Sequence, residues 1–268
     1  MCNFTYSKIM QHNTRDFSIL LSIRLLLIVI ITTLFFFHFL DLKIYLFSKN
    51  LNGYLSLFFI KIINPIAKIF NPSLILPLSL LTFVLAKSLQ KVLKNTQKLL
   101  IVTTRLGIKK KVLLISLNYY LLKIKHIIFS IILSGLVLHL LKYILGVSRP
   151  KYFFDYNYER YNFFNIEHNV NSLPSGHTQA AFTITVLFIL YFNKYNFFFI
   201  LLAILIGISR IFMSAHFPSD LIMGAYIGSV FPIILYNLKF KNDFLNFNKQ
   251  KLIDFNIFLK LIYIRFFI

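Results

Sequence analysis

The chain has 268 residues, of which 58% are hydrophobic and only 14% are charged. Soluble domains are usually about 45–50% apolar, so this composition favours a helical membrane protein with several spans. The net charge of +21 is not matched by a basic cluster on a soluble fold, so we expect no nucleic-acid partner. The lone cysteine, Cys2, excludes an internal disulfide, and the sequence has no Cys/His spacing for structural zinc.

Six segments are apolar over the length of about 20 residues that a helix needs to cross a bilayer. In chain order they are 17–40, 70–90, 126–146, 177–193, 196–215 and 219–238. The first has an apolar core longer than that of a signal peptide and lacks a small-residue cleavage site, so we expect an uncleaved anchor. The second starts weakly, because Pro72 and Pro77 interrupt it.

Basic residues orient these spans. The connection 87–125 is rich in lysine, and the tail after residue 238 adds more. With six spans, these two segments and the N-terminus fall on one side, which the positive-inside rule makes cytoplasmic. The loops at 41–69 and 147–176 and the short turn near residue 216 then lie on the opposite side.

The sequence shows no internal repeat and no low-complexity linker, so one domain is expected. The predicted organisation is a cytoplasmic N-terminus at 1–16, a six-span domain at 17–238 and a basic cytoplasmic tail at 239–268. Within the tail, the apolar segment 252–268 leaves two interpretations open, a seventh span or a helix on the membrane surface.

Two helices carry further patterns. In 54–70, Lys61, Asn64 and Lys68 form one polar stripe on an apolar helix, which favours an amphipathic helix at the membrane interface. In the sixth span, Gly224 and Gly228 have the GxxxG spacing that lets two membrane helices pack closely. A chance pair of glycines is the alternative interpretation.

Charged residues at the ends of membrane helices are costly and are functional suspects. The first such cluster is "KYILGVSRP", 142–150. Lys142 and Arg149 are seven residues apart, nearly two helical turns, so we expect them to share one helix face, with Pro150 ending the helix just beyond. Snorkelling of the two side chains to the interface is the ordinary alternative.

The second cluster is "NSLPSGHTQAAF", 171–182, at the start of the fourth span. Ser175 is a good N-cap, and Gly176 permits a close approach of the backbone. The helix that follows presents free N–H groups to the outside, which suits an anion, and His177 lies in its first turn. By itself the motif also fits a capping turn with a surface histidine.

The third cluster is "SRIFMSAHFPSD", 209–220. Arg210 lies near the outer end of the fifth span, and His216 suits the first turn of the sixth. Asp220 follows His216 by four residues, within reach of its ring if the helix continues through that turn. A carboxylate that holds one imidazole nitrogen frees the other as a nucleophile or base, although a plain capping pair is the alternative.

Each cluster has an ordinary explanation, but all three together would require three coincidences on one side of the bundle. Three cations, a helix N-terminus and two histidines instead predict a phosphate pocket that stabilises a pentacoordinate transition state.

The motifs Lys-x6-Arg-Pro (142–150), Pro-Ser-Gly-His (174–177) and Ser-Arg-x5-His-x3-Asp (209–220) resemble the three-part signature of the type-2 phosphatidate phosphatase (PAP2) superfamily. The likeness is to its membrane lipid phosphatases, which are related to vanadium haloperoxidases. All three motifs occur in order, without a substitution at a charged position. The resemblance implies an all-α, six-helix membrane bundle.

The resemblance also implies roles for the matching residues. His216 would attack phosphorus and form a phosphohistidine, Asp220 would orient its ring, and His177 would protonate the leaving group. The groups that would hold the phosphoryl oxygens are Lys142, Arg149, Arg210, the Ser175 hydroxyl and the Gly176 N–H. No cofactor or metal is implied, which agrees with the lack of an acidic cluster for magnesium. The spare carboxylates of the outer loop, Asp155, Glu159 and Glu167, are expected at the surface.

As a member of this branch, the chain would be a metal-independent lipid phosphatase, multi-pass in a bacterial inner (plasma) membrane, with its site on the periplasmic side. Candidate substrates are lipid A 1-phosphate, undecaprenyl pyrophosphate, phosphatidylglycerol phosphate and phosphatidate. Phe39-Leu40-Asp41-Leu42 is similar to a feature of the superfamily's lipid A phosphatases. The segments 41–69 and 147–173 are expected to select the headgroup.

Two alternatives stay open. The first is a non-catalytic lipid-phosphate binding or transport protein that kept the pocket, against which the intact His216, Asp220 and His177 argue. The second is vanadate-dependent halide oxidation, which is disfavoured because haloperoxidases of this kind are soluble. The sequence gives no indication of oligomeric state.

Overall fold

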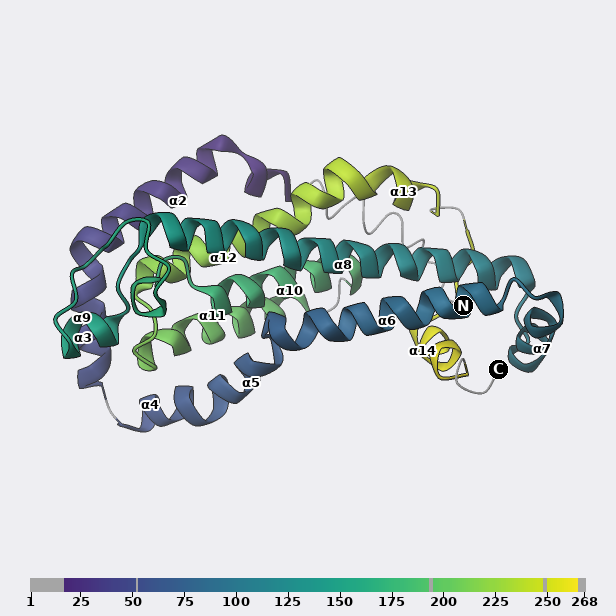
Figure 1. Cartoon of the computed structure of the whole chain (residues 1–268), viewed down its shortest axis with the longest axis horizontal. Coiled ribbons are helices and arrows are strands. Elements are labelled where there is room, and N and C mark those ends of the chain that lie inside the picture. The colour runs from purple at the N-terminus through teal and green to yellow at the C-terminus, as the bar shows by residue number, and fades with distance from the viewer. Residues whose placement is uncertain (1–16, 52, 193–194, 248–249, 265–268) are drawn as a thin grey trace.

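The computed structural model describes residues 17–51, 53–192, 195–247 and 250–264. In these ranges the regular structure is helical and contains no strand, which confirms the predicted all-α class (Figure 1). Four continuous helical stretches are long and apolar enough to cross a membrane: Ile23–Asn50, Gly53–Val92, Lys110–Leu145 and Pro218–Leu245. The chain is therefore a membrane protein.

Each predicted span coincides with an apolar helix. The first predicted span lies in a helical stretch made of η1 (Phe17–Leu21), α2 (Ile23–Phe35), η2 (Phe36–Leu40) and α3 (Asp41–Asn50). The second lies in a stretch made of α4 (Gly53–Phe58), η3 (Phe59–Ile63), α5 (Asn64–Ile69) and α6 (Pro72–Val92). After α7 (Thr96–Leu106), the remaining predicted spans coincide with α8 (Lys110–Leu145), α10 (Gly176–Phe192), α11 (Asn196–Phe212) and α12 (Pro218–Leu235). At 17 residues each, α10 and α11 lie at the short end of the range for a span.

The prediction that the first helix ends before residue 41 is wrong, because this helix continues as α3 to Asn50 and the next begins at Gly53. The prediction ended the first span where the apolar run reaches Asp41. That carboxylate is fully buried, however, and accepts hydrogen bonds from Ser219 and Arg160. A tertiary partner thus satisfies the charge that the local pattern placed in solvent.

The segment 54–70 is helical, as expected, and runs obliquely to α6 (Figure 1). Lys61 and Lys68 are exposed, as a solvent-facing stripe requires. Asn64 departs from this pattern, because its side-chain oxygen accepts a hydrogen bond from Arg210 at 2.6 Å. Its position at the membrane interface stays a prediction.

The third helix, α8, begins at Lys110, sixteen residues before the predicted start of the span at 126. Leu113 and Leu117 in this extension are fully buried, so one face of it is apolar and packs in the bundle. The lysines of the same segment made this apolar face hard to recognise in the sequence. The ammonium of Lys123 lies over the rings of Tyr119 and Tyr191, at 4.7 and 4.9 Å from their centres. Aromatic faces therefore accommodate the charge within the helix bundle.

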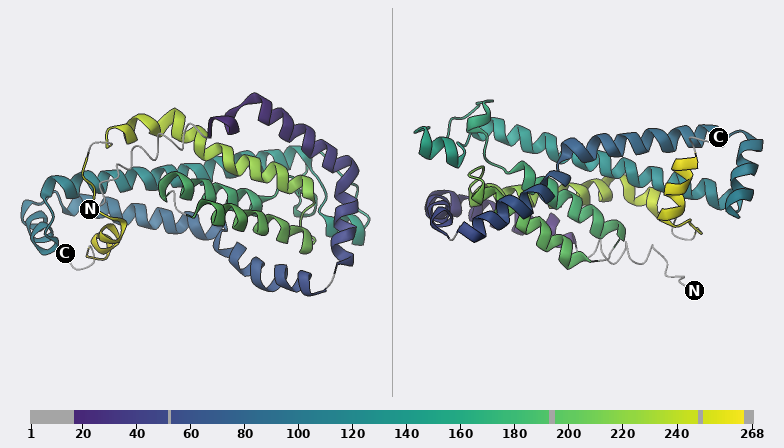
Figure 2. Two further views of the ribbon diagram at one scale, coloured as in Figure 1. Left: turned by 180° about the vertical axis from the view of Figure 1, so that it is seen from behind. Right: turned by 90° about the horizontal axis from the view of Figure 1, so that it is seen from below.

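The helices α8, α10 and α12 lie side by side at the centre of the bundle (Figures 1 and 2). A Cβ added at Gly224 of α12 would lie 2.6 Å from the carbonyl oxygen of Ser175, and one at Gly228 would overlap the Gln179 carbonyl of α10. The predicted close packing at this GxxxG pair is confirmed. It brings the first turns of α10 and α12 together.

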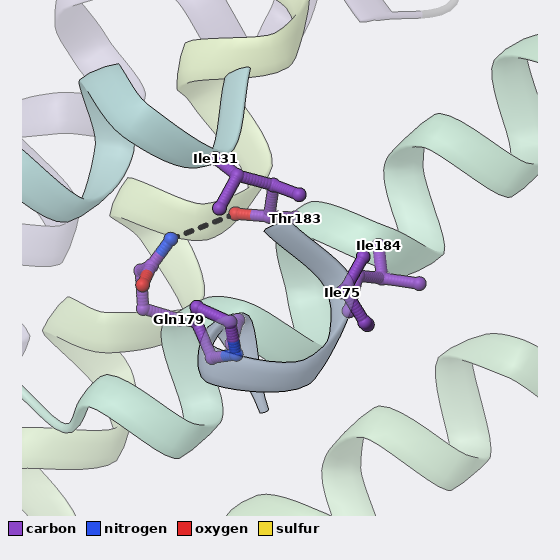
Figure 3. Close-up of a pocket in the computed structure, with 7 residues that line it drawn as sticks. Ile75, Ile131, Gln179, Thr183 and Ile184 are labelled. Carbon is purple, nitrogen blue, oxygen red and sulfur yellow. Dashed lines mark hydrogen bonds between the residues drawn. The ribbon is translucent and has the colours of Figure 1, made fainter. Parts of the chain in front are cut away.

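Buried polar side chains fix the register of these three helices. Gln179 donates to the hydroxyls of Ser134 and Thr183 at 2.7 and 2.9 Å, beside a small pocket between α6, α8 and α10 (Figure 3). Thr183 in turn donates to the Gly228 carbonyl at 3.1 Å. That carbonyl lacks its usual helical donor, because Pro232 stands four residues further on and has no N–H. The labelled apolar residues of the pocket are Ile75, Ile131 and Ile184.

The two ends of the bundle differ in character. The connection after α8, with α9 (Pro150–Asp155) and η4 (His168–Val170), lies at one end, and α7 lies at the other (Figure 1). The sixth span continues through η5 (Tyr236–Phe240) and α13 (Lys241–Leu245). The lysine-rich stretch is therefore far from the end where the signature motifs meet.

The C-terminal apolar segment forms α14 (Phe255–Ile264), a helix of ten residues. At about 1.5 Å per residue it covers about 15 Å, half of a hydrocarbon core of about 30 Å. It packs against α6, and its Phe258 ring stacks on Tyr120 of α8 at 4.3 Å. Within the described residues this short packed helix agrees with the surface-lying interpretation, and residues 265–268 lie outside them.

Candidate active site

The helix α8 ends differently from the prediction. Gly146 adopts a left-handed conformation with φ 51°, which terminates α8 at Leu145. Arg149 is the N-cap of α9, and Pro150 starts that helix rather than ending α8. The prediction that Lys142 and Arg149 share one helix face is therefore wrong, because a glycine in the left-handed region stops the helix between them.

Lys142 and Arg149 nevertheless converge, through Asn171. The buried Lys142 ammonium donates to the carbonyls of Asn171 and Ser172 at 2.5 and 3.1 Å. The Arg149 guanidinium donates to the Asn171 side-chain oxygen at 3.2 Å and to the His168 carbonyl at 3.0 Å. Sequence reasoning missed this role of Asn171, although it is the first residue of the second cluster, 171–182.

The helix α10 begins at Gly176, as the second motif predicts. Its Ser175 cap is fully buried, and its hydroxyl accepts from the Thr178 hydroxyl at 2.9 Å and more weakly from the Thr178 N–H at 3.5 Å. The Ser175 N–H donates to the carbonyl of Asp220 at 2.9 Å, which joins the second motif to the third. His177, the second residue of the helix, is half-buried at this end.

His216 and Asp220 form the predicted pair. Asp220 Oδ2 lies 3.2 Å from His216 Nδ1, and both side chains are buried. His216 lies before the helix rather than in its first turn, since Phe217 is the N-cap of α12. Ser172 was missed by sequence reasoning: its hydroxyl donates to Asp220 Oδ2 and lies 3.2 Å from His216 Nδ1. Among the described residues, every side-chain hydrogen bond of the ring uses Nδ1, which leaves Nε2 for chemistry.

Arg210 lies in the last turn of α11 and is 4% exposed. Its guanidinium donates to the Asn64 side chain at 2.6 Å and to the Ser209 hydroxyl at 3.1 Å. Its carbonyl accepts from the N–H groups of Ala215 and His216, at 3.0 and 3.3 Å. Arg210 thus fixes the turn that carries His216, and the second helix contributes Asn64 to the site.

Residues of all three motifs influence the pKa of the His216 imidazole. The pKa of His216 lies well below its ordinary value, first because the ring is buried and then because of four neighbouring basic groups: Lys142, Arg149, His177 and Arg210. His216 is therefore neutral at neutral pH, the state that a nucleophile needs. The predicted site residues are brought to one end of the bundle.

Other side chains define the border of this site. Asp155, Glu159 and Glu167 are exposed, as predicted. The pKa of the exposed His168 is lowered first by the charge of Arg149 and then by partial burial. Within the described ranges, no three His, Cys, Asp or Glu side chains are grouped so as to hold a metal ion.

Comparison with known protein families gives a match over the region of the candidate site. Residues 123–244 match the profile of the PAP2 superfamily, and the match contains all three motifs. This part of the chain is therefore similar to the PAP2 superfamily. The PAP2 match runs from the middle of α8 to α13 and so covers every predicted site residue, whereas Asn64 lies outside it.

Curated proteins similar to this chain include two called lipid A 1-phosphatase. That of Rhizobium johnstonii is 35% identical over 109 residues, covering 41% of this chain and 45% of the relative. That of Rhizobium etli is 35% identical over 105 residues, covering 39% and 45%. The bacitracin transport permease protein BcrC of Bacillus licheniformis is 38% identical over 72 residues, covering 26% and 36%. The chain thus spans less than half the length of each relative.

Among solved structures, the crystal structure of Aquifex aeolicus LpxE is similar, with a TM-score of 0.46 and 24% identity. The similarity covers 74% of this chain and 95% of that protein.

Proposed function

We propose that this protein is a lipid phosphate phosphatase of the membrane, which hydrolyses a phosphomonoester or pyrophosphate through a phosphohistidine. The observation that carries the proposal is a buried, neutral His216, held through Nδ1 by Asp220 at 3.2 Å and surrounded by cationic groups. The match of residues 123–244 to the PAP2 superfamily supports it.

In the first proposed step, the lone pair of His216 Nε2 attacks the phosphorus atom. The bond from phosphorus to the lipid oxygen breaks, and its electron pair leaves with that oxygen. His177, at the start of α10, donates the proton that completes the leaving group. Asp220 accepts a hydrogen bond from the Nδ1–H of His216 and stabilises the positive charge that the ring gains.

In the second proposed step, a water oxygen attacks the phosphorus of the phosphohistidine. The P–N bond breaks, its electron pair returns to Nε2, and inorganic phosphate is released. His177 accepts the proton from the attacking water, which restores both histidines. The proposed ligands of the phosphoryl oxygens are Lys142, Arg149, Arg210, the Ser175 hydroxyl and the Gly176 N–H.

We place the protein in a bacterial inner membrane with the site on the periplasmic side. The motifs and the lysine-rich stretch around α7 lie at opposite ends of the bundle (Figure 1). Because lysine-rich loops stay in the cytoplasm, this separation supports a periplasmic site.

Lipid A 1-phosphate is the first candidate substrate, because two relatives at 35% identity carry the name lipid A 1-phosphatase. Undecaprenyl pyrophosphate, phosphatidylglycerol phosphate and phosphatidate are the other candidates. All four present a phosphate on an apolar anchor, so the lipid chains would stay in the bilayer while the phosphate enters the polar end of the bundle.

The test is phosphate release by the purified protein from each of the four lipids in detergent. We expect release from at least one lipid, loss of release in His216→Ala, and lipid binding that survives the substitution. The exposed Asp155→Asn provides a control that should behave as wild type. A protein that binds lipid phosphate but releases none would instead support the non-catalytic binding alternative.

A further inference from the structure

The five residues from His216 to Asp220 are held by a side chain from outside the three motifs. Asp41 of α3 is fully buried, and its Oδ1 accepts a hydrogen bond from the Ser219 N–H at 2.9 Å. Its Oδ2 accepts from the Ser219 hydroxyl at 2.6 Å. Ser219 immediately precedes Asp220, so a carboxylate from the first span caps the first turn of α12.

Arg160 holds the same stretch at a second point. Its guanidinium donates to Asp41 Oδ2 at 2.5 Å and lies 3.7 Å from the ring centre of Phe217. Phe217 immediately follows His216 and is fully buried. The Phe37 ring of the first span lies 4.4 Å from the guanidinium. Arg160 therefore joins η2 and α3 to the turn that carries the nucleophile.

The charges near the start of α12 explain why the partner of Asp41 is a cation, Arg160. Asp41 and Asp220 are both fully buried near the start of α12, where two carboxylates would repel each other. Burial lowers the pKa of Arg160, whereas the charges of Asp41 and Asp220 both raise it. A guanidinium keeps its proton under these conditions and so offsets both carboxylates.

We infer that Asp41 and Arg160 are positioning residues for the His216–Asp220 pair, an inference that rests on the proposed function. Asp41 contacts Ser219, which precedes Asp220, and Arg160 contacts Phe217, which follows His216. These contacts fix the backbone positions from which the His216 and Asp220 side chains extend. A displacement of about 1 Å at a reacting group costs about 10²-fold in rate.

The first measurement is the kinetics of Asp41→Asn, which keeps the side-chain size and removes the charge. We expect kcat to fall about 10- to 100-fold, with KM little changed because the phosphate-binding cations keep their partners. Glu159→Gln is the matched control, since it removes an exposed carboxylate beside Arg160 and should leave kcat unchanged. A larger KM with an unaltered kcat would contradict positioning.

The second measurement does not depend on turnover. In protein labelled with ¹⁵N-histidine, the ring signals of His216 are assigned by their loss in His216→Ala. Asp41→Asn should shift these signals, and Glu159→Gln should not. Unshifted His216 signals would overturn the inference, whereas a wild-type protein that releases no phosphate would overturn only the proposed function.

A milder variant covers the case in which Asp41→Asn does not fold. Ser219→Ala removes one hydrogen bond to Asp41 and keeps the other, which comes from the backbone. We expect a smaller shift of the same His216 signals and a smaller fall in kcat. Wild-type values of both quantities in this variant would also overturn the inference.

Discussion

Ser172 and His216 meet at the same oxygen atom, Oδ2 of Asp220. The Ser172 hydroxyl donates a short hydrogen bond to this oxygen, and His216 Nδ1 lies 3.2 Å from it. The Phe217 N–H donates to it as well, at 2.8 Å. In the described part of the chain, the other oxygen of this carboxylate, Oδ1, has no hydrogen-bond partner. Three donors on one oxygen fix the orientation of the carboxylate and, through it, that of the imidazole.

This arrangement predicts unequal effects of two substitutions. Asp220→Asn should lower kcat by about 10³- to 10⁴-fold, because the amide cannot hold the ring in the tautomer that frees Nε2. Ser172→Ala should lower it far less, because Asp220 keeps the Phe217 and His216 contacts. Initial rates and trapping of the acid-labile phosphohistidine measure both. Equal losses in the two variants would show that Ser172 contributes more than orientation.

The pKa of His216 leads to a second prediction, on pH dependence. Burial and the surrounding positive charges lower this pKa well below 6.5. A lowered pKa keeps the ring neutral, and so nucleophilic, until the pH falls below the lowered value. The contribution of His216 to kcat/KM should therefore persist from neutral pH through pH 6.5 and be lost only at lower pH.

Removing a charge tests this assignment. Arg149→Gln should raise the pKa of His216 and move the acid limb of kcat/KM to higher pH, besides lowering the rate. Arg105→Gln, in α7 at the other end of the bundle, is the matched control and should leave the profile in place. Ionisation of the substrate is common to all three proteins and cancels in the comparison. An acid limb that moves to lower pH in Arg149→Gln has the wrong sign.

Much of the candidate site could be predicted from local spacing. The distance of four residues between His216 and Asp220 survives as a contact of 3.2 Å, although a turn rather than a continuous helix produces it. The N-cap at Ser175 and the glycine pair at Gly224 and Gly228 were also predicted, because each depends on residues close together in the chain. For these features, the spacing within the motif was sufficient for the prediction.

The missed residues have partners that are remote in sequence. Asn64 and Arg210 are 146 positions apart, and Asp41 and Ser219 are 178 apart. A single polar residue in an apolar helix gives no local sign of its partner, so Asn64 was assigned to a solvent-facing stripe and Asp41 to a loop. The left-handed Gly146 was overlooked for another reason, since Pro150 gave a stronger helix-stop signal four residues later.

Independence from metal is the third prediction. The proposed nucleophile and proton donor are histidines, and the proposed phosphate ligands are cationic side chains and backbone N–H groups, which do the work that Mg²⁺ does elsewhere. Phosphate release should therefore be unchanged in excess EDTA, with a magnesium-dependent phosphatase in a parallel reaction as the control. Inhibition that added Mg²⁺ reverses would contradict the proposed chemistry.

The contact of α12 with α10 leads to a fourth prediction. Gly224→Ala would place a methyl group 2.6 Å from the Ser175 carbonyl, so the two helix starts must separate. We expect a loss of about 1–3 kcal/mol in the free energy of unfolding and a lower kcat. Gly135→Ala in α8 is the control, because its added Cβ meets nothing within 4 Å. Thermal unfolding in detergent and phosphate release measure the two effects, and equal behaviour of both variants would argue against close packing at the site.

The last prediction concerns Asn64, which the second span contributes to the site. Asn64→Ala removes the oxygen that accepts from Arg210 at 2.6 Å. Among the described residues, the guanidinium then keeps its hydrogen bonds to the Ser209 hydroxyl alone. A hydrogen bond to a charged group is worth about 1.5–3 kcal/mol, so a less firmly held Arg210 should bind a phosphate mimic about tenfold more weakly. Inhibition by vanadate measures this affinity.

Lys68→Ala provides the matched control for Asn64→Ala. Lys68 lies on the same short helix, α5, and its side chain is exposed. We expect this variant to be inhibited by vanadate as strongly as the wild type, because it touches no group of the site. If Asn64→Ala also keeps the wild-type inhibition constant, then Arg210 does not bind the phosphate through the geometry that Asn64 maintains. The second span would then only cover the site, and Lys142 and Arg149 would be its principal anion ligands.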